Sequence, residues 1–482
     1  MKNGIQLITY ANSLGSNLQE LNEFLELYGK EAITGVHILP FFPSSADRGF
    51  APMTYRSIDP EFGDWQTIGK IADKYDLVAD FMVNHISKQS EYFKDYLKKG
   101  DESKWSNLFL PLEKLAENGE IKQEHIDLIY TRKPRAPWID VTLADGTQKS
   151  VWCTFAEEQI DLDVNSRTGK QFIEEEIVAL CKRGLAMLRL DAFAYVTKKM
   201  GTNCFFVEPD VWEILDRIRD IAANQGVEVL PEIHEHYTIQ KKLSDHGYWV
   251  YDFALPMLVL HTLYSQNTKR LKDWLDICPR KQITTLDTHD GIGVVDVADL
   301  MTQEEIDETV ETLYKKGSNL NRRYSSAEYD NLDIYQINCS YFSALSNNPE
   351  HYLLSRVIQF FAPGIPQVYY QGLLAGENDV EKVERTRHGR DINRHDYTLP
   401  EIGQEMKRPV VQKLFKIMAF RNQHPAFDGE FTLKKSDDNS LNIRWNNNDA
   451  FAELQMDLSN YSCIVSHSPV SNWESGSFNP LT

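Results

Sequence analysis

The sequence predicts an α/β protein built on a (β/α)8 TIM barrel, and three observations lead to this fold class. Short apolar runs alternate with amphipathic helical segments from the first residues onward. Eight of these runs suit strands that are buried on both faces, as the strands of a closed parallel barrel are. Acidic residues follow three of the runs, at the strand ends where barrel enzymes carry their active sites.

The first part of the chain supplies three of the predicted strands, at 5–10, 35–42 and 77–85. Between the first two, apolar residues at helical spacing precede Gly29, a residue type that commonly follows a helix. This helical stripe consists of Leu18, Leu21, Leu25 and Tyr28.

The second part supplies the other five strands and the clearest helices. Helices are predicted over 168–184 and 207–226, and Pro209 with Asp210 gives the second helix its start signal. The five strands are predicted at 184–193, 227–234, 248–256, 282–290 and 364–372.

Three segments depart from this rhythm. Two are too long for βα loops and predict small domains inserted after strands 3 and 7, and the last predicts a C-terminal β-domain of short alternating strands. The predicted organisation is barrel 1–85, inserted domain 86–167, barrel 168–293, inserted domain 294–350, barrel 351–428 and β-domain 429–482.

Composition limits the partners and the compartment. The 482 residues carry a formal charge of -20, which disfavours nucleic acid and anionic membranes as partners because both require a cationic face. The N-terminus turns polar before a secretory core could form, and no apolar run approaches a membrane span, so a cytoplasmic protein is expected. Six scattered cysteines without CxxC pairs indicate reduced thiols and neither disulfides nor a cysteine-bound metal.

Asp191, Glu232 and Asp290 lie at the carboxyl ends of predicted strands and are the candidate catalytic acids. A retaining glycosidase mechanism needs one ionised carboxylate as nucleophile and one protonated carboxylic acid. Arg189 lies two residues before Asp191, so on a strand it faces the same way and can keep Asp191 ionised. Apolar Leu230 holds the equivalent place before Glu232, which favours Asp191 as nucleophile and Glu232 as acid/base.

Histidines accompany these acids. His85 and His289 are expected to hydrogen-bond sugar hydroxyls. His234 and His236 fall on one face of a predicted strand and could be two zinc ligands, but no third ligand stands at a suitable spacing, so no metal is predicted.

The segments FMVNH, RLDAF, PEIHEH and THDG resemble the four sequence regions of the α-amylase superfamily, in the same order. With ILPFFPSSADRGF, EEQIDLDVNS, NLDIYQIN, APGIPQVYYQG and GRDINRH, the chain resembles the sucrose phosphorylases of that superfamily over nearly its whole length. The resemblance implies Asp191 as the glucosyl-forming nucleophile, Glu232 as acid/base and Asp290 as transition-state stabiliser.

The resemblance also implies a set of substrate-binding residues. Asp47 and Arg394 match an ion pair that closes the glucose pocket, and a basic loop matches one that brings positive charge to the acceptor. That loop contains Tyr130, Arg132, Lys133 and Arg135. The remaining positions matched to glucose, fructose or phosphate contacts are His85, Phe155, Arg189, Tyr195, His234, His289, Tyr335 and Gln336.

The expected substrates are therefore sucrose and phosphate, and the products fructose and glucose 1-phosphate, with no cofactor and no structural calcium. Tyr335 stands where phosphosugar-specific relatives are expected to carry His, so a sucrose 6'-phosphate phosphorylase ranks second. An α-glucosidase or transglucosidase ranks third, and a non-catalytic binding protein is disfavoured because all three acids are present. The oligomeric state, a homodimer included, is left open.

Overall fold

All eight predicted barrel strands form in the computed structural model, which describes residues 1–116, 121–132, 135–322, 334–470, 473 and 476–482. Each is shorter than its apolar run, because the flanking residues leave the sheet as loops. The strands are β1 (Gln6–Thr9), β2 (Gly35–Ile38), β3 (Asp76–Met82), β8 (Leu185–Asp191), β9 (Glu228–Pro231), β10 (Val250–Asp252), β11 (Gln282–Thr284) and β15 (Ile365–Tyr369). Their order in the sheet is β10-β11-β15-β1-β2-β3-β8-β9. Neighbours in the sheet are therefore consecutive barrel strands along the chain, except that β15, the last, lies beside β1, the first.

The chain divides into two compact units. The terminal unit comprises Met1–His37, His234–Asn321 and Ile334–Thr482, and the central unit comprises Ile38–Ile233 and Arg322–Asp333. This division does not follow the boundaries expected from the sequence, which stay a prediction.

In the terminal unit, β1 pairs parallel with β15, β15 with β11, and β11 with β10. The helices that accompany these strands are α1 (Leu18–Phe24), α7 (Tyr237–Asp245), α8 (Leu255–Ser265), α9 (Lys269–Ile277), α10 (Gln303–Lys315), α11 (Tyr341–Ala344), α12 (Pro349–Phe361), α13 (Tyr370–Leu373), α14 (Val380–Thr386), α15 (Leu399–Glu405) and α16 (Pro409–Gln423). A π-helical turn over Leu25–Gly29 continues α1 to the predicted glycine stop.

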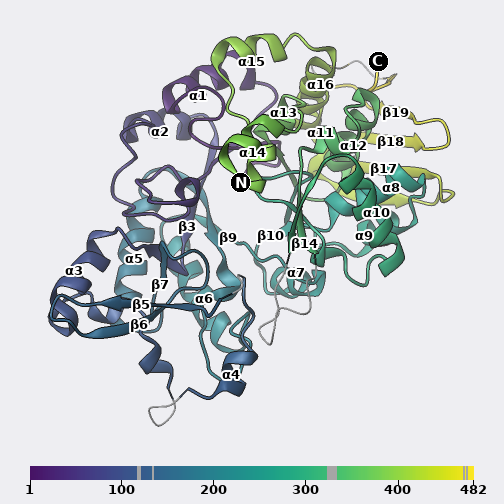
Figure 1. Ribbon diagram of the computed structural model, residues 1–482. Helices are drawn as coiled ribbons and strands as arrows, with labels where there is room; N and C mark the ends of the chain where they lie inside the picture. Colours follow the sequence, from purple (N-terminus) through teal and green to yellow (C-terminus); the bar gives the residue numbers. More distant parts are fainter. Residues whose placement is uncertain (117–120, 133–134, 323–333, 471–472, 474–475) are drawn as a thin grey trace. The chain divides into compact units, whose positions relative to one another are not determined.

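The C-terminal part of the same unit is an antiparallel sheet, as the alternating pattern predicts. Its strands are β16 (Glu430–Lys434), β17 (Ser440–Asn447), β18 (Ala450–Asp457), β19 (Ser462–His467) and β20 (Gly476–Phe478). The indole Nε1 of Trp445 donates to the carbonyl oxygen of Phe361, 2.8 Å away, which ties β17 to the end of α12. Figure 1 shows α12 and α16 close to this sheet.

In the central unit, β3 pairs parallel with β8 and β8 with β9. Its helices are α2 (Trp65–Ala72), α3 (Glu91–Lys99), α4 (Gln123–Asp127), α5 (Arg167–Cys181) and α6 (Asp210–Ala223). The segment after β3 adds two antiparallel pairs, which are β4 (His85–Ser87) with β7 (Gln159–Asp161) and β5 (Trp138–Thr142) with β6 (Gln148–Trp152).

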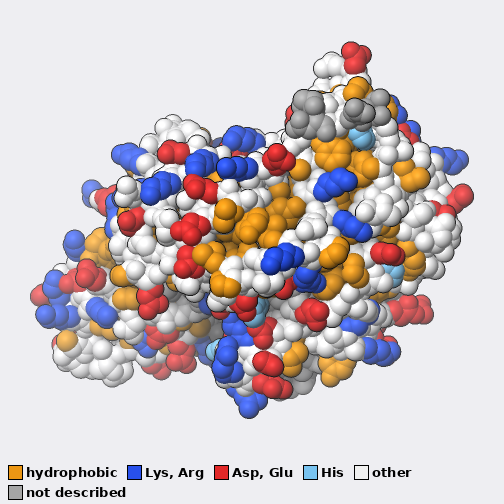
Figure 2. Space-filling view, turned by 90° about the horizontal axis from the view of Figure 1, so that it is seen from above, with side chains coloured by type: hydrophobic (Ala, Val, Ile, Leu, Met, Phe, Trp, Pro, Cys, Tyr) orange, Lys and Arg blue, Asp and Glu red, His pale blue; other side chains and the backbone are white. Residues whose placement is uncertain are grey.

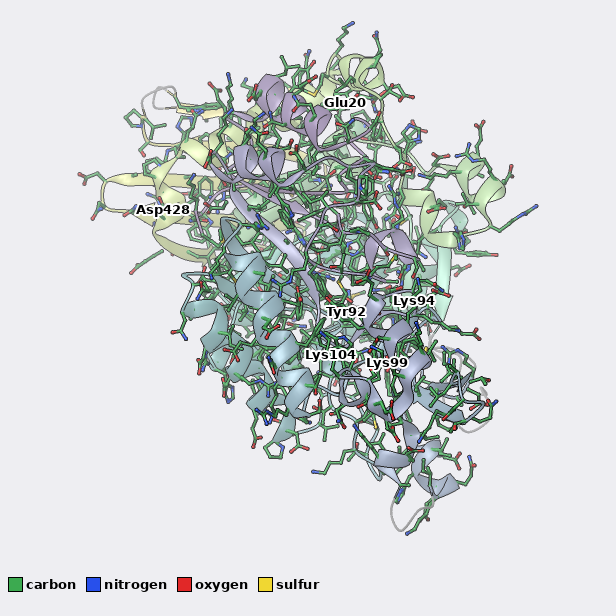
Figure 3. All side chains as sticks on the ribbon, turned by 90° about the vertical axis from the view of Figure 1, so that its left-hand side faces the viewer. Glu20, Tyr92, Lys94, Lys99, Lys104 and Asp428 are labelled. Atoms are coloured by element: carbon green, nitrogen blue, oxygen red, sulfur yellow. The ribbon has the colours of Figure 1, made fainter. Side chains whose placement is uncertain are left out.

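Helix α3 shows how this segment attaches to the barrel helices. The ring centroid of Tyr92 lies 4.8 Å from that of Trp105 and 5.2 Å from that of Phe172 on α5, while the ammonium of Lys104 lies 4.6 Å from the Trp105 ring. The side chains of Tyr92 and Lys104 are labelled in Figure 3. Aromatic packing therefore joins the segment to α5.

Charge is dispersed over the surface displayed in Figure 2, where acidic and basic side chains are interspersed among apolar patches. Among the residues that the structure describes, no helix has the length and hydrophobicity needed to cross a lipid bilayer.

Candidate active site

The central unit brings two of the three predicted acids to adjacent strand ends. Asp191 is the last residue of β8, and Glu232 directly follows β9. The two strands are in parallel register, with Leu190 opposite Pro231. The backbone N–H of Glu232 continues the ladder by donating to the carbonyl oxygen of Leu190 at 2.9 Å. Strand pairing, rather than a loop, thus positions both carboxyl groups.

The guanidinium of Arg189 contacts three carboxyl groups. Nη1 of Arg189 lies 2.9 Å from Oδ1 of Asp191, and Nη2 lies 3.8 Å from Oε2 of Glu232. Nη1 also pairs with Asp80, a fully buried residue of β3 that stands directly opposite Arg189 in the β3–β8 register. The sequence spacing correctly predicts the Arg189–Asp191 contact. Asp80 is missed because its position depends on the register between two distant segments.

The surroundings of Asp191 raise its pKa. Burial raises the pKa of Asp191 to about 8, the carboxylates of Glu232 and Asp80 act in the same direction, and Arg189 opposes them. Arg189 contacts Asp191 more closely than Glu232, and its positive charge opposes the rise in the pKa of Asp191.

Ala192 fixes the acid of this pair. Its φ of 49° lies in the left-handed region, which a residue with a Cβ adopts only at a cost of about 1 kcal/mol or more. In this conformation its N–H donates to Oε2 of Glu232 at 2.9 Å. The strained turn after Asp191 therefore orients the carboxyl group of Glu232, a relation that the sequence motif does not reveal.

His85 lies among aromatic rings in the same unit. It is the first residue of β4, and its Nε2 is 2.9 Å from the carbonyl oxygen of Phe50. Burial lowers the pKa of His85, so its imidazole is neutral at neutral pH and donates that hydrogen bond. The ring of Phe155 lies 5.5 Å from His85 and 5.1 Å from Tyr195. His85, Phe155 and Tyr195, three residues predicted to contact the sugar, thus pack together, and we call this cluster of rings the wall.

A buried lysine supports this wall and was not predicted. Nζ of Lys198 lies 2.6 Å from Oδ2 of Asp161 and 2.5 Å from the carbonyl oxygen of Tyr195, and it also donates to Asn84. Both charged partners are almost fully buried, so removing either one would leave an uncompensated buried charge. The ammonium thereby ties the backbone of Tyr195 to β7 and to Asn84, the residue before β4.

The predicted acceptor loop separates into residues with different contacts. The guanidinium carbon of Arg132 lies 6.0 Å from the Tyr195 ring. Arg135 instead donates to backbone carbonyl oxygens, including that of Phe155, so its contacts position the wall. Tyr130 packs on Phe205 at 4.8 Å. Lys133 lies outside the described residues.

Asp290, the third predicted acid, belongs to the terminal unit and has a cationic environment. Nη1 of Arg390 lies 3.2 Å from its Oδ1, and Nε2 of His289 lies 3.5 Å from its Oδ2. Burial alone would raise the pKa of Asp290, but His289, Arg390 and more distant cations lower it below the ordinary value. Arg390, like Asp80 and Lys198, was not predicted from the sequence, although it lies in the segment GRDINRH.

Arg394 also meets the Asp290 loop, through the backbone. Its Nε and Nη2 donate to the carbonyl oxygen of His289 at 3.1 and 2.8 Å, and its guanidinium carbon lies 5.8 Å from the ring of Tyr10. Asp47 belongs to the central unit, where its φ of 53° begins a short 3-10 turn. The expected Asp47–Arg394 ion pair stays a prediction.

The two histidines after β9 do not share a strand face, so that expectation is wrong. The strand ends at Pro231, and His236 is the N-cap residue of α7. Nδ1 of His234 lies 3.3 Å from Oδ2 of Asp296, whereas Nε2 of His236 lies 3.1 Å from Oδ2 of Asp299.

His234 also lies beside the predicted fructosyl-site residues. Its ring stacks on Phe253 with centroids 3.7 Å apart, and the Tyr335 ring is 6.1 Å away. Tyr335 and Gln336 are buried in β14 (Ile334–Asn338), where Gln336 pairs with Gly293.

Acids at the ends of barrel strands, one pair around an arginine and one beside a histidine, define a glycoside-active barrel enzyme. The family model for the α-amylase catalytic domain matches residues 17–412, and the chain belongs to this family. This membership confirms the predicted (β/α)8 fold class and a glycosyltransferase of the glycoside hydrolase type.

Relatives from this family cover almost the whole chain. A sucrose phosphorylase of Streptococcus mutans is 55% identical over 92% of both chains. A glucosylglycerol phosphorylase of Marinobacter adhaerens is 44% identical over 98% of both chains. The crystal structure of a sucrose 6F-phosphate phosphorylase from Thermoanaerobacter thermosaccharolyticum is 43% identical, covers 99% of both chains and superposes with a TM-score of 0.96.

Proposed function

We propose that the chain catalyses the reversible phosphorolysis of sucrose to α-D-glucose 1-phosphate and fructose, with retention at the anomeric carbon. The Asp191–Glu232 pair around Arg189 is the observation that carries the mechanism. The choice of sucrose is supported by the high identity to a sucrose phosphorylase.

In the first step, Oδ of Asp191 attacks the anomeric carbon as the bond to the fructosyl oxygen breaks. Glu232 gives its proton to that oxygen, so fructose leaves neutral and a β-glucosyl ester remains on Asp191. Arg189, whose Nη1 donates to Oδ1 of Asp191, stabilises the carboxylate form that attacks.

In the second step, a phosphate oxygen attacks the same carbon from the face that fructose left. Glu232, now deprotonated, accepts the proton of the incoming phosphate, and Asp191 leaves as a carboxylate. Asp290 remains ionised throughout because of Arg390 and His289, and we assign it to stabilising the positively charged transition state.

The remaining predicted residues complete the proposal. Asp47 and Arg394 close the glucose pocket. The residues that contact glucose are His85, Phe155, Tyr195 and His289. The residues that face the acceptor are His234, Tyr335 and Gln336. Arg132 supplies the phosphate-side charge, since Arg135 is bound to backbone carbonyl groups. No metal or cofactor takes part, and a cytoplasmic location and a possible homodimer belong to the same proposal.

Sucrose 6'-phosphate phosphorylase is the second candidate function. A sucrose 6(F)-phosphate phosphorylase of Thermoanaerobacterium thermosaccharolyticum is 44% identical over 97% of both chains. Against it stand the higher identity to the sucrose enzyme and the presence of Tyr335 beside His234.

Product analysis distinguishes these activities. With sucrose and inorganic phosphate, we expect fructose and α-glucose 1-phosphate to form faster than free glucose forms with sucrose alone. Hydrolysis that equals or exceeds phosphorolysis at millimolar phosphate would contradict the proposal. Sucrose 6'-phosphate and glycerol, tested in parallel, show whether another donor or acceptor is preferred.

A further inference from the structure

A cavity of about 640 Å³ lies in the terminal unit, at the amino ends of three of its strands. Trp249, Arg280 and Gly364 line it, and they stand just before β10, β11 and β15. Asp290 comes after the carboxyl end of β11. The cavity is therefore separate from the site described above, and its size falls within the range of about 300–1,000 Å³ that small-molecule sites occupy.

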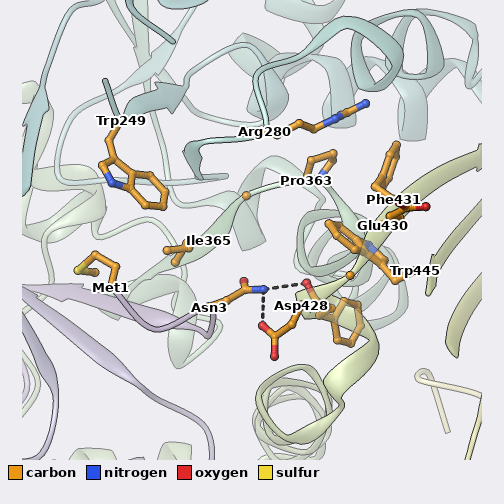
Figure 4. Close-up of a pocket in the computed structure, with 13 residues that line it drawn as sticks. Met1, Asn3, Trp249, Arg280, Pro363, Ile365, Asp428, Glu430, Phe431 and Trp445 are labelled. Carbon is orange, nitrogen blue, oxygen red and sulfur yellow. Dashed lines mark hydrogen bonds between the residues drawn. The ribbon is translucent and has the colours of Figure 1, made fainter. Parts of the chain in front are cut away.

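Aromatic rings form two walls of this cavity. Figure 4 shows Trp249 on one side and Phe431 with Trp445 on the other, and Pro363 and Ile365 between them. Trp445 is held rigidly, since its Nε1 donates to the backbone. Rings of this kind bind apolar C–H faces without losing much side-chain freedom.

The rim adds polar groups of both signs. Asp428, Glu430 and Arg280 are exposed there. Nδ2 of Asn3 donates to Oδ1 of Asp428 at 2.9 Å, and Nη2 of Arg421 donates to Oδ1 of Asn3 at 2.8 Å. A buried arginine thus orients the amide that orients the carboxylate, so this part of the rim is preorganised.

The charges limit the chemistry of the ligand. The acidic and basic side chains that line the cavity are two carboxylates and one guanidinium, which disfavours an anion. The Arg280 guanidinium carbon lies 4.8 Å from the Phe431 ring, and Nζ of Lys281 lies 5.5 Å from the Trp249 ring, so cationic side chains already contact both rings and disfavour a ligand cation. A neutral molecule with apolar C–H faces and many hydroxyl groups satisfies both the walls and the rim.

From this arrangement we infer that the cavity is a second, non-catalytic site for a neutral mono- or disaccharide. The sugar stacks on Trp249, and its hydroxyl groups hydrogen-bond with Asp428, Glu430 and Arg280.

Fluorine NMR of the full chain labelled with 5-fluorotryptophan tests this site, with the Trp249 resonance assigned from Trp249→Phe. We expect maltose to shift this resonance saturably, whereas choline and inorganic phosphate leave it in place. Glu430→Ala should weaken the response several-fold, and Glu304→Ala, an exposed acid on α10 of the same unit, should not.

Turnover of sucrose by the Glu430→Ala protein should match that of the unsubstituted protein. An unmoved Trp249 resonance up to high millimolar maltose, or one moved by choline or phosphate instead, would overturn the inference. Because turnover is measured on the same samples, failure of this site is distinguishable from failure of the proposed activity.

Discussion

The two units place carboxyl groups in opposite electrostatic environments. In the central unit, Asp80, Asp191 and Glu232 share the guanidinium of Arg189, and the pKa of Asp191 is raised. In the terminal unit, Asp290 has Arg390 and His289 beside it, and its pKa is lowered.

The difference between these environments supports the catalytic roles that we propose. A carboxyl pair with too little positive charge retains a proton, which general acid catalysis requires. A carboxylate with an excess of positive charge stays ionised and can stabilise developing positive charge. The same residue type therefore performs both tasks because its neighbours differ.

The largest expected effect comes from removing the nucleophile. Asp191→Ala should lower kcat by about 10⁵-fold, because no other group can form the covalent ester. Glu232→Gln should lose sucrose cleavage but retain turnover of glucosyl donors whose leaving group needs no proton. Steady-state kinetics with sucrose and with α-glucosyl fluoride separate the two roles; equal loss on both donors would argue against Glu232 as the acid.

Asp290→Asn should come next, with a loss of about 10³-fold in kcat and a smaller change in KM, because its charge acts mainly in the transition state. The acid limb of the wild-type pH profile should contain no contribution from Asp290, since its lowered pKa keeps it ionised. A variant with a raised KM and an unchanged kcat would show that Asp290 contributes only to binding of the ground state.

The proposed pocket closure predicts a loss of roughly 10²-fold for either Asp47→Ala or Arg394→Ala, because distal contacts position the anomeric carbon. The loss should appear in kcat as well as KM, and the intact enzyme should not digest starch. Near wild-type turnover of both variants, or good activity on starch, would show that the closed pocket does not exist.

Asp80→Asn should have a smaller effect that is visible in the pH profile. Asp80 raises the pKa of Asp191, so its removal should move the limb of the kcat/KM profile that reports Asp191 to lower pH by about one unit. Glu176→Gln is the matched control, since Glu176 is a buried carboxylate 2.9 Å from Arg56 in the same unit. A shift in both profiles, or in neither, would remove the special role of Asp80.

The smallest effect concerns stability. Between the ordinary carboxyl pKa of 3.8 and the raised value of about 8, the folded protein holds a proton that the unfolded chain releases, so stability falls as pH rises through this window. Asp191→Asn removes this dependence. Its Tm should exceed that of the wild type by a few degrees at the alkaline end and approach it at the acid end.

The sequence predicted the features that depend on local spacing. Buried apolar runs gave the eight strands, and the two-residue spacing of Arg189 and Asp191 gave their contact. Asp80 was missed because only the β3–β8 register brings it opposite Arg189.

Other features depend on backbone geometry that residue identity does not encode. Ala192 adopts a positive φ although alanine does not favour it, and β9 ends too early for His234 and His236 to share a face. Arginine side chains commonly bind phosphate, yet the guanidinium of Arg135 binds backbone carbonyl groups. In each case tertiary contacts override the local pattern.

The central claim is that Asp191 forms the covalent bond to glucose, while Glu232 donates a proton to the leaving fructose and accepts one from phosphate. Its most direct test is to react the Glu232→Gln protein with α-glucosyl fluoride without phosphate, and then to map the modified peptide by mass spectrometry. We expect one glucosyl group, carried by Asp191 and released as glucose 1-phosphate when phosphate is added. A glucosyl group on any other residue would contradict the account.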